Sequence, residues 1–333
     1  MYQMLSALAM LLALAAASPT RTTNIESHAH IEKRATISDA ATLGYASTNG
    51  GTKGGSGGTV TTVSTLAQFT AAVDEDDSTP RIVVVSGTIS GETDIRIGSN
   101  KTIVGLPGAT FDGVGLYLRR QSNIIIRNII SSKVLASTKG DGIRIDQTTN
   151  VWVDHCELYS DLDHDKDYYD GLIDASHAAD FITISYTYFH DHYKTSLVGH
   201  SDSNGDEDTG HLRITYANNY WENLGSRGPS LRFGTGHVYN NYYKNMDTAI
   251  DSRDGAEILV QSNVFVNVTE PIASLYSDDV GYVTASDNDL GGATNTAPAG
   301  NITAADIPYS FTLLGSSNVA STVPGAAGAI LTW

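Results

Sequence analysis

Short runs of alternating apolar and polar residues recur along the chain from Asn123 onward. In each run, two or three alternating apolar residues are followed by a small or polar residue and, two places later, by an apolar one. The runs are NIIIRNII (123–130), VWVDHCEL (151–158), FITISYTYF (181–189), LRITYANNY (212–220), HVYNNYY (237–243), ILVQSNVF (258–265) and VTASDNDL (283–290). Alternation with period two predicts β-strands.

The small or polar position of these runs recurs at intervals typical of a solenoid. The aligned residues are Asn128, Cys156, Thr187, Asn218, Asn240, Asn263 and Asn288, separated by 28, 31, 31, 22, 23 and 25 residues. Leucine-rich repeats share this period but need leucines that the chain lacks, and an antiparallel sandwich would not keep one residue type at one place. We therefore expect an all-β, right-handed, single-stranded parallel β-helix in which asparagines stack as a ladder.

The segments before residue 123 fit the beginning of such a solenoid. RIVVVSGTI (81–89) and KTIVGL (101–106) are apolar, β-branched runs that predict the first coils. The segment 62–76 instead spaces Leu66, Phe69, Ala72 and Val73 as on one face of a helix. This predicts an N-terminal helix that caps the open end of the solenoid.

The N-terminal residues have the pattern of a secreted precursor. Residues 1–17 contain an apolar run that ends in small residues, as a signal peptide does, although no positive charge precedes it. Residues 18–34 read as a propeptide or flexible tail ending in Lys33-Arg34, which leaves 35–333 as the β-helix domain. Secretion would permit glycosylation at sequons beginning at Asn100, Asn267 and Asn301.

The charge and cysteine content exclude several classes of protein. The 333 residues include 20 Lys and Arg against 37 Asp and Glu, a formal net charge of −17, and no basic patch suggests nucleic-acid binding. No apolar run is long enough to span a membrane. Cys156 is the only cysteine, so the chain has no intramolecular disulfide. We expect a monomer that binds neither nucleic acid nor membranes.

Three aspartates are predicted to meet on neighbouring coils. GDGIRID (140–146) places Asp141 just before one strand, and DYYDGLIDASH (167–177) places Asp170 and Asp174 before the next. Three carboxylates around one point would repel one another, and a hard cation with oxygen ligands would relieve that repulsion. Solvated acids that cap turns are the other interpretation, and the spacing does not decide between the two.

Three basic residues follow the acidic stretch. HDHYKTSLVG (190–199) carries Lys194, and NLGSRGPSLRFG (223–234) carries Arg227 and Arg232. Together they could receive an anionic ligand, although each taken singly is more typical of a solvated surface. From residue type alone, Arg227 would be interpreted as a clamp for a carboxylate.

Three blocks of this chain resemble the signature blocks of pectate lyases of polysaccharide lyase family 1. They are NVWVDHCEL (150–158), YDGLIDASHAADFITISYTYFHDHYKTSLVG (169–199) and RGPSLRFGTGHVYNNYY (227–243). The resemblance covers most of residues 35–333. It implies a secreted β-helix that cleaves de-esterified homogalacturonan, or polygalacturonate, by calcium-dependent β-elimination, leaving 4,5-unsaturated oligogalacturonates.

The resemblance also implies roles for individual residues. The implied Ca²⁺ ligands are Asp141, Asp170 and Asp174. Lys194 would bind the substrate carboxylate and assist catalysis, Arg227 would be the catalytic base, and Arg232 a second catalytic or substrate-binding arginine. Lys139 stands where many members have a further acidic ligand, and Asp170 where some have Glu. Both departures imply weaker calcium binding in the absence of substrate.

Three other functions are compatible with such a solenoid. A pectin lyase acts on methyl-esterified chains without calcium, and the three aspartates with Lys194 argue against it. A polygalacturonase shares the fold but carries GHG and RIK motifs that are absent here. A non-catalytic, polysaccharide-binding solenoid would keep the ladder without needing Lys194, Arg227 and Arg232 together.

Overall fold

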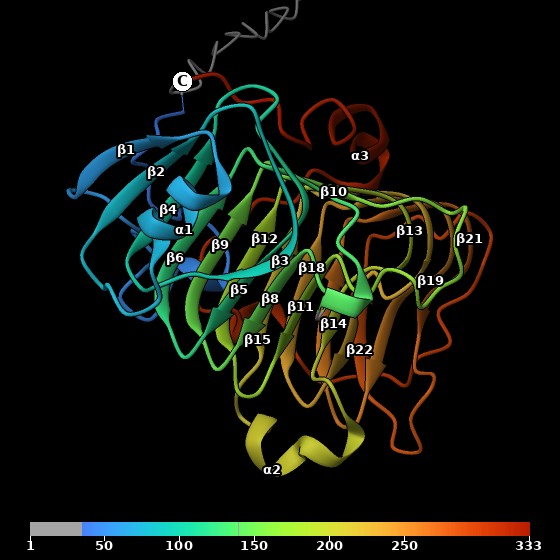
Figure 1. Ribbon diagram of the computed structural model, residues 1–333. Coiled ribbons are helices and arrows are strands. Elements are labelled where there is room, and N and C mark those ends of the chain that lie inside the picture. The colour runs from blue at the N-terminus through green and yellow to red at the C-terminus, as the bar shows by residue number, and fades with distance from the viewer. Residues whose placement is uncertain (1–34, 139) are drawn as a thin grey trace, which may run out of the picture. The chain divides into compact units, whose positions relative to one another are not determined.

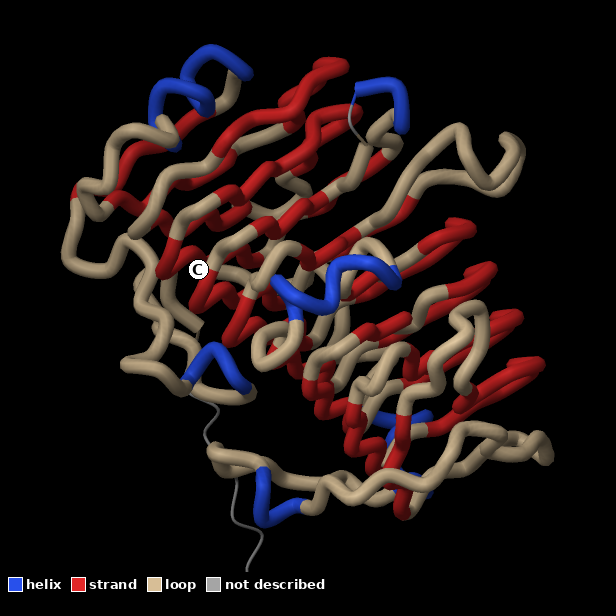
Figure 2. The backbone as a smooth tube through the Cα atoms, turned by 90° about the horizontal axis from the view of Figure 1, so that it is seen from below, coloured by secondary structure: helices blue, strands red, loops and turns tan. Residues whose placement is uncertain are grey.

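The computed structural model describes residues 35–138 and 140–333. The expected signal peptide, the segment ending in Lys33-Arg34, and Lys139 lie outside the described residues. Residues 35–333 form one compact unit, a right-handed parallel β-helix whose coils stack as successive rungs (Figure 1, Figure 2). In the described part of the chain, no helix has the length and apolar character that a membrane span requires.

One face of the solenoid is a ten-stranded parallel sheet. In spatial order its strands are β1 (Thr59–Val63), β2 (Arg81–Val85), β4 (Lys101–Gly105), β6 (Ser122–Arg127), β9 (Thr149–Asp154), β12 (Asp180–Ser185), β15 (Arg213–Ala217), β18 (Thr235–Tyr239), β20 (Glu257–Gln261) and β22 (Tyr282–Ser286). Inward residues stack in register across coils, as Ile126, Val153 and Ile184 do. All three are buried, which explains why these positions are β-branched.

The second sheet divides into two arms. Its strands are β3 (Thr88–Arg96), β5 (Thr110–Arg119), β7 (Ile130–Ser132), β8 (Ile143–Asp146), β10 (Glu157–Tyr159), β11 (Ile173–Ser176), β13 (Tyr188–Lys194), β14 (Leu197–Val198), β16 (Tyr220–Ser226), β17 (Ser230–Arg232), β19 (Tyr242–Arg253) and β21 (Val264–Ala273). The long β5 pairs with β7 through its first residues and with β8 through its last. β19 likewise joins β16 to β17. In the coils between β5 and β19, a corner separates the arm β7-β10-β13-β16 from the arm β8-β11-β14-β17.

Helices are few and short. They are α1 (Leu66–Val73), α2 (Gly205–Asp208) and α3 (Ser316–Thr322), with 3-10 turns η1 (Tyr45–Ser47), η2 (Ala136–Thr138), η3 (Asp202–Asn204) and η4 (Ala304–Asp306). α1 begins at Thr65, whose side chain accepts a hydrogen bond from the Gln68 N–H, and buries Phe69 against Phe111. It covers the end of the solenoid, as its apolar spacing predicted.

An asparagine ladder runs through the last coils, but its register differs from the expected one. The buried ladder consists of Asn219, Asn241, Asn263 and Asn288, and each Nδ2 donates to the next Oδ1 at 3.0 Å. The position two places later is correspondingly held by Trp221 and Tyr243, which stack with their ring centroids 5.5 Å apart. The predicted Asn218 and Asn240 are each one residue too early.

The mistaken register has a physical cause. Asn218 and Asn240 occupy left-handed corner positions, with φ of 58° and 56°, and the Nδ2 of Asn240 donates to Asn218 Oδ1 at 3.1 Å. Asn128 lies at the same kind of corner and exchanges hydrogen bonds with the backbone of Leu331 instead of joining a ladder. Adjacent asparagines at 218–219 and 240–241 fit both rows, so alternation alone could not separate them.

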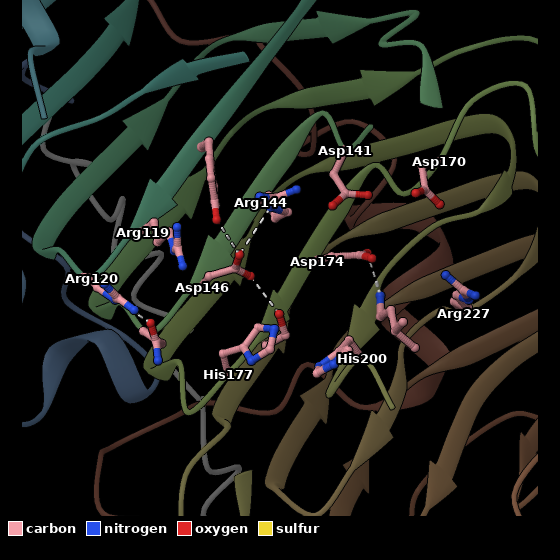
Figure 3. A pocket seen from close by; sticks show the side chains of 14 residues that line it. Arg119, Arg120, Asp141, Arg144, Asp146, Asp170, Asp174, His177, His200 and Arg227 are labelled. Carbon is pink, nitrogen blue, oxygen red and sulfur yellow. Dashed lines mark hydrogen bonds and ion pairs between the residues drawn. The ribbon is translucent and has the colours of Figure 1, made fainter. Parts of the chain in front are cut away.

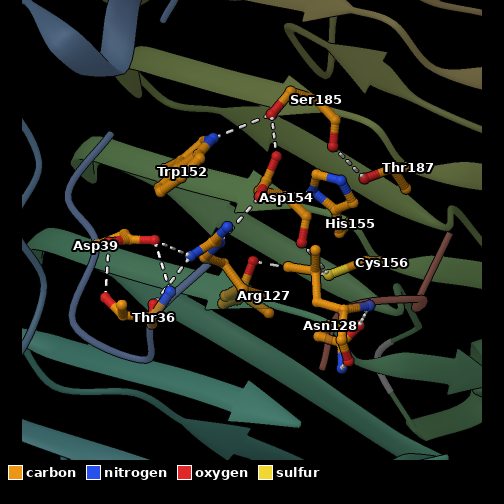
Figure 4. Close-up of polar contacts among 12 residues, drawn as sticks. Thr36, Asp39, Arg127, Asn128, Trp152, Asp154, His155, Cys156, Ser185 and Thr187 are labelled. Atoms are coloured by element: carbon orange, nitrogen blue, oxygen red, sulfur yellow. Dashed lines mark hydrogen bonds and ion pairs between the residues drawn. The ribbon is translucent and has the colours of Figure 1, made fainter. Parts of the chain in front are cut away.

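Both ends of the described chain meet on the ten-stranded sheet. Arg127 Nε donates to Asp154 Oδ2 at 2.9 Å, and Arg127 Nη1 lies 3.5 Å from Asp39 Oδ2 (Figure 4). Its guanidinium lies over the rings of Trp152 and of Trp333, the last residue. One buried, fully paired arginine thus fastens the N-terminal and C-terminal segments to the same coil.

Candidate active site

The predicted site residues lie at the corner between the two arms of the second sheet. Asp141 precedes β8, Asp170 precedes β11, Lys194 ends β13 just before β14, and Arg227 precedes β17. Because the coils stack in parallel, these four positions follow one another along the solenoid. Asp174 differs from the expectation, since it lies within β11 and not before it.

An open groove of about 590 Å³ runs over the outer face of the arm that contains β8 and β11 (Figure 3). The residues that line it are Tyr117, Arg119, Arg120, Asp141, Arg144, Asp146, Gln147, Asp170, Asp174, Ser176, His177, Leu197, His200 and Arg227. Four of the six predicted site residues are among them. Lys194 and Arg232 are not, and their positions are described below.

The three aspartates gather around Gly171. The Gly171 N–H donates to Asp141 Oδ1 at 2.9 Å, and the Leu197 N–H donates to Asp174 Oδ1 at 2.8 Å. A Cβ atom on Gly171 would lie 2.5 Å from Asp174 Oδ1 and 2.8 Å from Asp141 Oδ1. Only a glycine therefore leaves room for both carboxylates, and Asp170 completes the group (Figure 3).

This arrangement makes ionisation of the carboxylates costly. Burial raises the pKa of Asp141 well above its ordinary value, and the charges of Asp174 and Asp170 raise it further. Burial also raises the pKa of Asp174 to about 7, although the charge of Arg227 and the Leu197 N–H oppose the change. A positive charge placed among these oxygens would favour their ionised forms.

The donors suit a hard cation, but the protein does not supply a complete shell. Ca²⁺ usually takes six to eight oxygen ligands, among which carboxylates are common. Across residues 35–138 and 140–333, however, no three acidic, histidine or cysteine side chains are grouped, as they lie, in a way that could hold a metal ion. Asp141, Asp170 and Asp174 therefore offer the donor chemistry that a hard cation needs, but their side chains do not surround one metal position as they lie.

Lys194 is held against the acidic group. Its ammonium lies 3.0 Å from Asp170 Oδ1 and 3.1 Å from Asp167 Oδ1. Burial alone would lower the pKa of Lys194, but the hydrogen bonds to these two carboxylates outweigh it and raise the pKa. Lys194 thus remains a fixed positive charge beside the groove.

Arg227 is a basic residue that the protein leaves available at the end of the groove where Asp170 and Asp174 lie. Its backbone takes the left-handed corner conformation, with φ of 66°, and its carbonyl accepts a hydrogen bond from the Ser196 N–H at 2.8 Å. Within the described residues, no carboxylate forms an ion pair with its guanidinium. Figure 3 shows the guanidinium on the side of Asp170 and Asp174, away from Arg119 and Arg120.

Arg232 lies further along the same arm, where it is buried and paired. Its Nε is 2.5 Å from Asp202 Oδ1 and 3.0 Å from Asp254 Oδ2, and its Nη1 donates to the Gly199 carbonyl at 2.7 Å. Arg227 and Arg232, although close in sequence, therefore have different environments.

A buried histidine that the sequence did not single out lies beneath the acidic group. His192 Nε2 is 2.6 Å from the Asp170 carbonyl and 3.1 Å from the Lys194 carbonyl, while Nδ1 is 2.6 Å from Ser160 Oγ. Two acceptors face Nε2, so Nε2 carries the proton and the Ser160 hydroxyl donates to Nδ1. Burial lowers the pKa of His192 to about 4, which keeps the ring neutral.

The groove also contains arginines that the sequence did not single out. Arg144 lies over the ring of Tyr117, 3.7 Å from its centroid, and its Nε is 3.3 Å from Asp146 Oδ2. Arg119 and Arg120 lie one coil earlier. The groove thus holds four arginines beside four aspartates, so guanidinium groups are available to an anion even in a chain of net charge −17. The signal available in the sequence was the alternation of Arg144 with Asp146 along one predicted strand.

Comparison with known proteins identifies the family. The family model described as pectate lyase matches residues 18–330. A probable pectate lyase A of Neosartorya fischeri is 56% identical over 290 residues, covering 86% of this chain and 88% of that protein.

Two solved structures share the fold over most of their length. The pectate lyase of Bacillus sp. N165 in complex with trigalacturonate has a TM-score of 0.79 and 34% identity, covering 86% of this chain and 98% of that one. A structure described as giving insight into the substrate specificity and anti β-elimination mechanism of pectate lyase has a TM-score of 0.75 and 25% identity, with 89% and 99% covered. On this sequence and structural similarity, the chain belongs to the pectate lyase family of polysaccharide lyases.

Proposed function

We propose that this protein is a secreted, calcium-dependent pectate lyase that cleaves de-esterified homogalacturonan by β-elimination. The observation that carries the proposal is the convergence of Asp141, Asp170 and Asp174 at one corner of the groove, with the guanidinium of Arg227 beside them. A site of this kind is suited to a substrate that is itself a carboxylate, since a cation can link acid to acid.

The proposed substrate is a chain of galacturonate units. The related Bacillus enzyme was solved with trigalacturonate. Here the groove provides Arg119, Arg120, Arg144 and Arg227 along its length. Guanidinium groups bind carboxylates through paired hydrogen bonds, so a row of them suits a polymer with one carboxylate per sugar.

The reaction removes the proton from C5, the sugar carbon that bears the carboxylate. The electron pair of that C–H bond forms the C4–C5 double bond, the bond from C4 to the glycosidic oxygen breaks, and that oxygen takes up a proton. Negative charge develops on the C6 carboxylate as C5 loses its proton. Lys194, a fixed ammonium beside the groove, is positioned to stabilise this charge.

Arg227 is the proposed base. A guanidinium ordinarily keeps its proton at neutral pH, so this role requires positive charge nearby that disfavours the protonated form. Arg227 has no carboxylate partner within the described residues that would hold its proton in place, whereas Arg232 has two. The pairing therefore favours Arg227 over Arg232 for proton transfer.

Calcium is the proposed cofactor, held by Asp141, Asp170 and Asp174. When bound, it would supply a Lewis acid for the substrate carboxylate and relieve the repulsion among the three aspartates. Because the three side chains do not surround one metal position as they lie, cation binding requires them to move closer together or the substrate to supply further ligands. The shorter Asp170 and the presence of Lys139 in place of an acid point in the same direction.

Secretion is part of the proposal and rests on the N-terminal pattern described above. Two of the three sequons are accessible, because Asn267 and Asn301 are exposed. Asn100 is only partly exposed, and its Nδ2 donates to the Ser78 carbonyl at 2.8 Å.

The experiment is incubation with polygalacturonate followed in the ultraviolet, with and without chelator. Elimination creates a double bond conjugated to the carboxylate, so absorbance should rise in step with chain scission, and chelation should stop both. Reducing ends without absorbance would establish a hydrolase. Full activity in excess chelator, or a preference for highly methyl-esterified chains, would indicate a pectin lyase. No scission of either substrate, with binding retained, would indicate a non-catalytic solenoid.

A further inference from the structure

Arg232 and Arg253 lie beyond Arg227 on the arm that carries the groove, where they extend a row of outward-facing positions. The two arginines are direct partners on neighbouring strands, β17 and β19. On the outer face of the arm, they extend the row of side chains that contains Asp146 and Ser176. These two residues are partners on β8 and β11 and line the groove. The coil between contributes Gly199, which has no side chain to interrupt the row, and a Cβ atom there would lie 2.9 Å from Arg232 Cβ.

A carboxylate of the protein already lies on these two arginines. Asp202 Oδ1 is 2.5 Å from Arg232 Nε, 3.4 Å from Arg253 Nη2 and 3.1 Å from Ser277 Oγ. The Asp202 side chain is 49% exposed, whereas the two arginine side chains are 8% and 9% exposed. One oxygen of an exposed side chain is therefore received by three groups of a largely buried site.

The charges of this cluster balance without Asp202. Asp254 lies 3.0 Å from Arg232 with its side chain 6% exposed, and Asp251 lies 3.9 Å from Arg253 with its side chain 1% exposed. Two buried cations thus already face two buried anions. Asp202 is a third carboxylate and the only one of the three that is well exposed, so replacing it by another carboxylate would leave the charge of the buried cluster unchanged.

The position of Asp202 allows such an exchange. Asp202 is the first residue of the short 3-10 helix η3. Ser201 caps this helix by accepting a hydrogen bond from the Ser203 N–H. Two residues earlier, His200 lines the groove. The arginine hydrogen bond and charges lower the pKa of Asp202 despite its partial burial, so it is ionised, as a uronate would be.

We propose that Arg253 joins Arg232, for which the family resemblance already implies substrate binding, in a carboxylate-binding position for a galacturonate unit, and that Asp202 occupies this position until the substrate displaces it. This inference rests on the proposed function, because it assigns one subsite of that groove and its internal competitor. A carboxylate is the chemical class that the site demonstrably receives, and Arg253 becomes a substrate-binding residue.

The test compares Asp202→Asn with Asp206→Asn. Asp206 is an exposed acid on the adjacent α2, so its substitution removes the same charge from the same region without touching either arginine. The amide that replaces the Asp202 carboxylate keeps its shape but competes poorly for a guanidinium. The KM for polygalacturonate should fall roughly three- to tenfold in Asp202→Asn relative to Asp206→Asn, with kcat unchanged within twofold. Equal KM values, or a higher KM or a lower kcat in Asp202→Asn, would overturn the inference, since Asp202 would then be inert or would position Arg232.

A second variant tests the receiving site itself. Arg253→Gln should weaken binding of hexagalacturonate, measured by calorimetry, by about tenfold or more, and adding Asp202→Asn should then bring a smaller gain than it does when Arg253 is present. A gain of the usual size in the double variant would overturn the assignment of Arg253. Failure of the proposed function would look different, because the unmodified enzyme would then produce no ultraviolet-absorbing product from polygalacturonate.

Discussion

The ammonium of Lys194 lies 3.0 Å from the Asp170 carboxylate, so a proposed substrate-binding residue is paired directly with a proposed calcium ligand. The backbones of the two loops also meet, through a parallel bridge between Gly171 and Lys194. Each charge therefore limits where the other can lie. A substrate carboxylate or a cation that enters here must share or replace this ion pair.

The first prediction concerns Lys194. Lys194→Ala should weaken both oligogalacturonate binding and turnover, because it removes a charged partner of the substrate carboxylate and leaves Asp170 without a counter-charge. A hydrogen bond to a charged group contributes about 1.5–3 kcal/mol, which corresponds to a loss of roughly ten- to 150-fold in kcat/KM. Lys166→Ala, in the exposed part of the preceding loop, is the control and should behave as the unmodified enzyme. Comparable losses in both variants would mean that general charge matters and not the position of Lys194.

The second prediction separates the proposed base from the other arginines. Arg227→Lys keeps a positive charge but not the placed guanidinium, so kcat should fall by about 10²- to 10⁴-fold while hexagalacturonate still binds. Arg119→Lys, in the same groove, should change KM more than kcat. Steady-state kinetics and calorimetry on both variants decide the matter. An Arg227→Lys variant with near-normal turnover would require another base.

The third prediction concerns the acidic group. Asp174→Asn should raise the calcium concentration needed for half-maximal activity by at least about tenfold, because one of three carboxylate donors becomes a weaker amide. Calcium binding measured by calorimetry in the presence of trigalacturonate should weaken in parallel. The thermal midpoint should not fall, since burial opposes ionisation of Asp174 in the folded protein. An unchanged calcium requirement would remove Asp174 from the ligand set.

The fourth prediction assigns His192 a positioning role. His192→Leu removes the N–H that binds the Asp170 and Lys194 carbonyls and should reduce kcat by about tenfold or more. His192→Gln keeps a donor near the place of Nε2 and should recover most of the activity. Both variants lose the same buried ring, so similar melting temperatures with different activities would separate positioning from stability. Equal activities in the two variants would contradict the role.

The fifth prediction concerns acid stability and a histidine far from the groove. Burial lowers the pKa of His237 to about 4, while in the unfolded chain it is about 6.5. As the pH falls below 6.5, the unfolded state takes up a proton that the folded state does not accept until about pH 4. The stability present above pH 6.5 should therefore decrease by about 3 kcal/mol between these values.

Urea denaturation at pH 7 and pH 4 provides the measurement. His237→Gln cannot take up this proton, so it should show a smaller acid-induced loss than the unmodified protein, the difference being about 3 kcal/mol. Burial lowers the pKa of His192 as well, but His192 is present in both proteins, so its contribution to the acid-induced loss cancels from the comparison. Parallel losses in the two proteins would show that His237 is not protonated selectively in the unfolded state.

The sequence predicted the parallel β-helix and the capping helix because both depend on local periodicity. Strand alternation and the helical spacing of Phe69, Ala72 and Val73 are properties of neighbouring residues. The register of the ladder was wrong by one residue at Asn218 and Asn240. Adjacent asparagines satisfy two rows equally well, and only the pairing between coils, with Asn219 against Asn241, decides between them.

The candidate site was predictable to the extent that its residues fall at equivalent places in successive repeats. Asp141, Asp170 and Asp174 could be brought near one another from the repeat because neighbouring coils stack, although the register pairs Asp174 with Arg144 and not with Asp141. The roles of His192, Arg253 and Asp202 could not be predicted from the sequence. The partners of Asp202 are 30, 51 and 75 residues away in the chain, and the alignment of those segments depends on loop lengths that no local pattern encodes.

The fastening of both chain ends around Arg127 has a practical consequence for the design of fusion proteins. The first and last described segments lie on the ten-stranded sheet, whereas the groove lies on an arm of the other sheet. A purification tag or a surface anchor attached at residue 35 should therefore leave the groove accessible to a long polymer. At the other end, Trp333 stacks on Arg127 and donates its indole N–H to the Gly105 carbonyl at 2.7 Å. An extension there needs a flexible linker that begins after Trp333, so that immobilised enzyme keeps this ring in place.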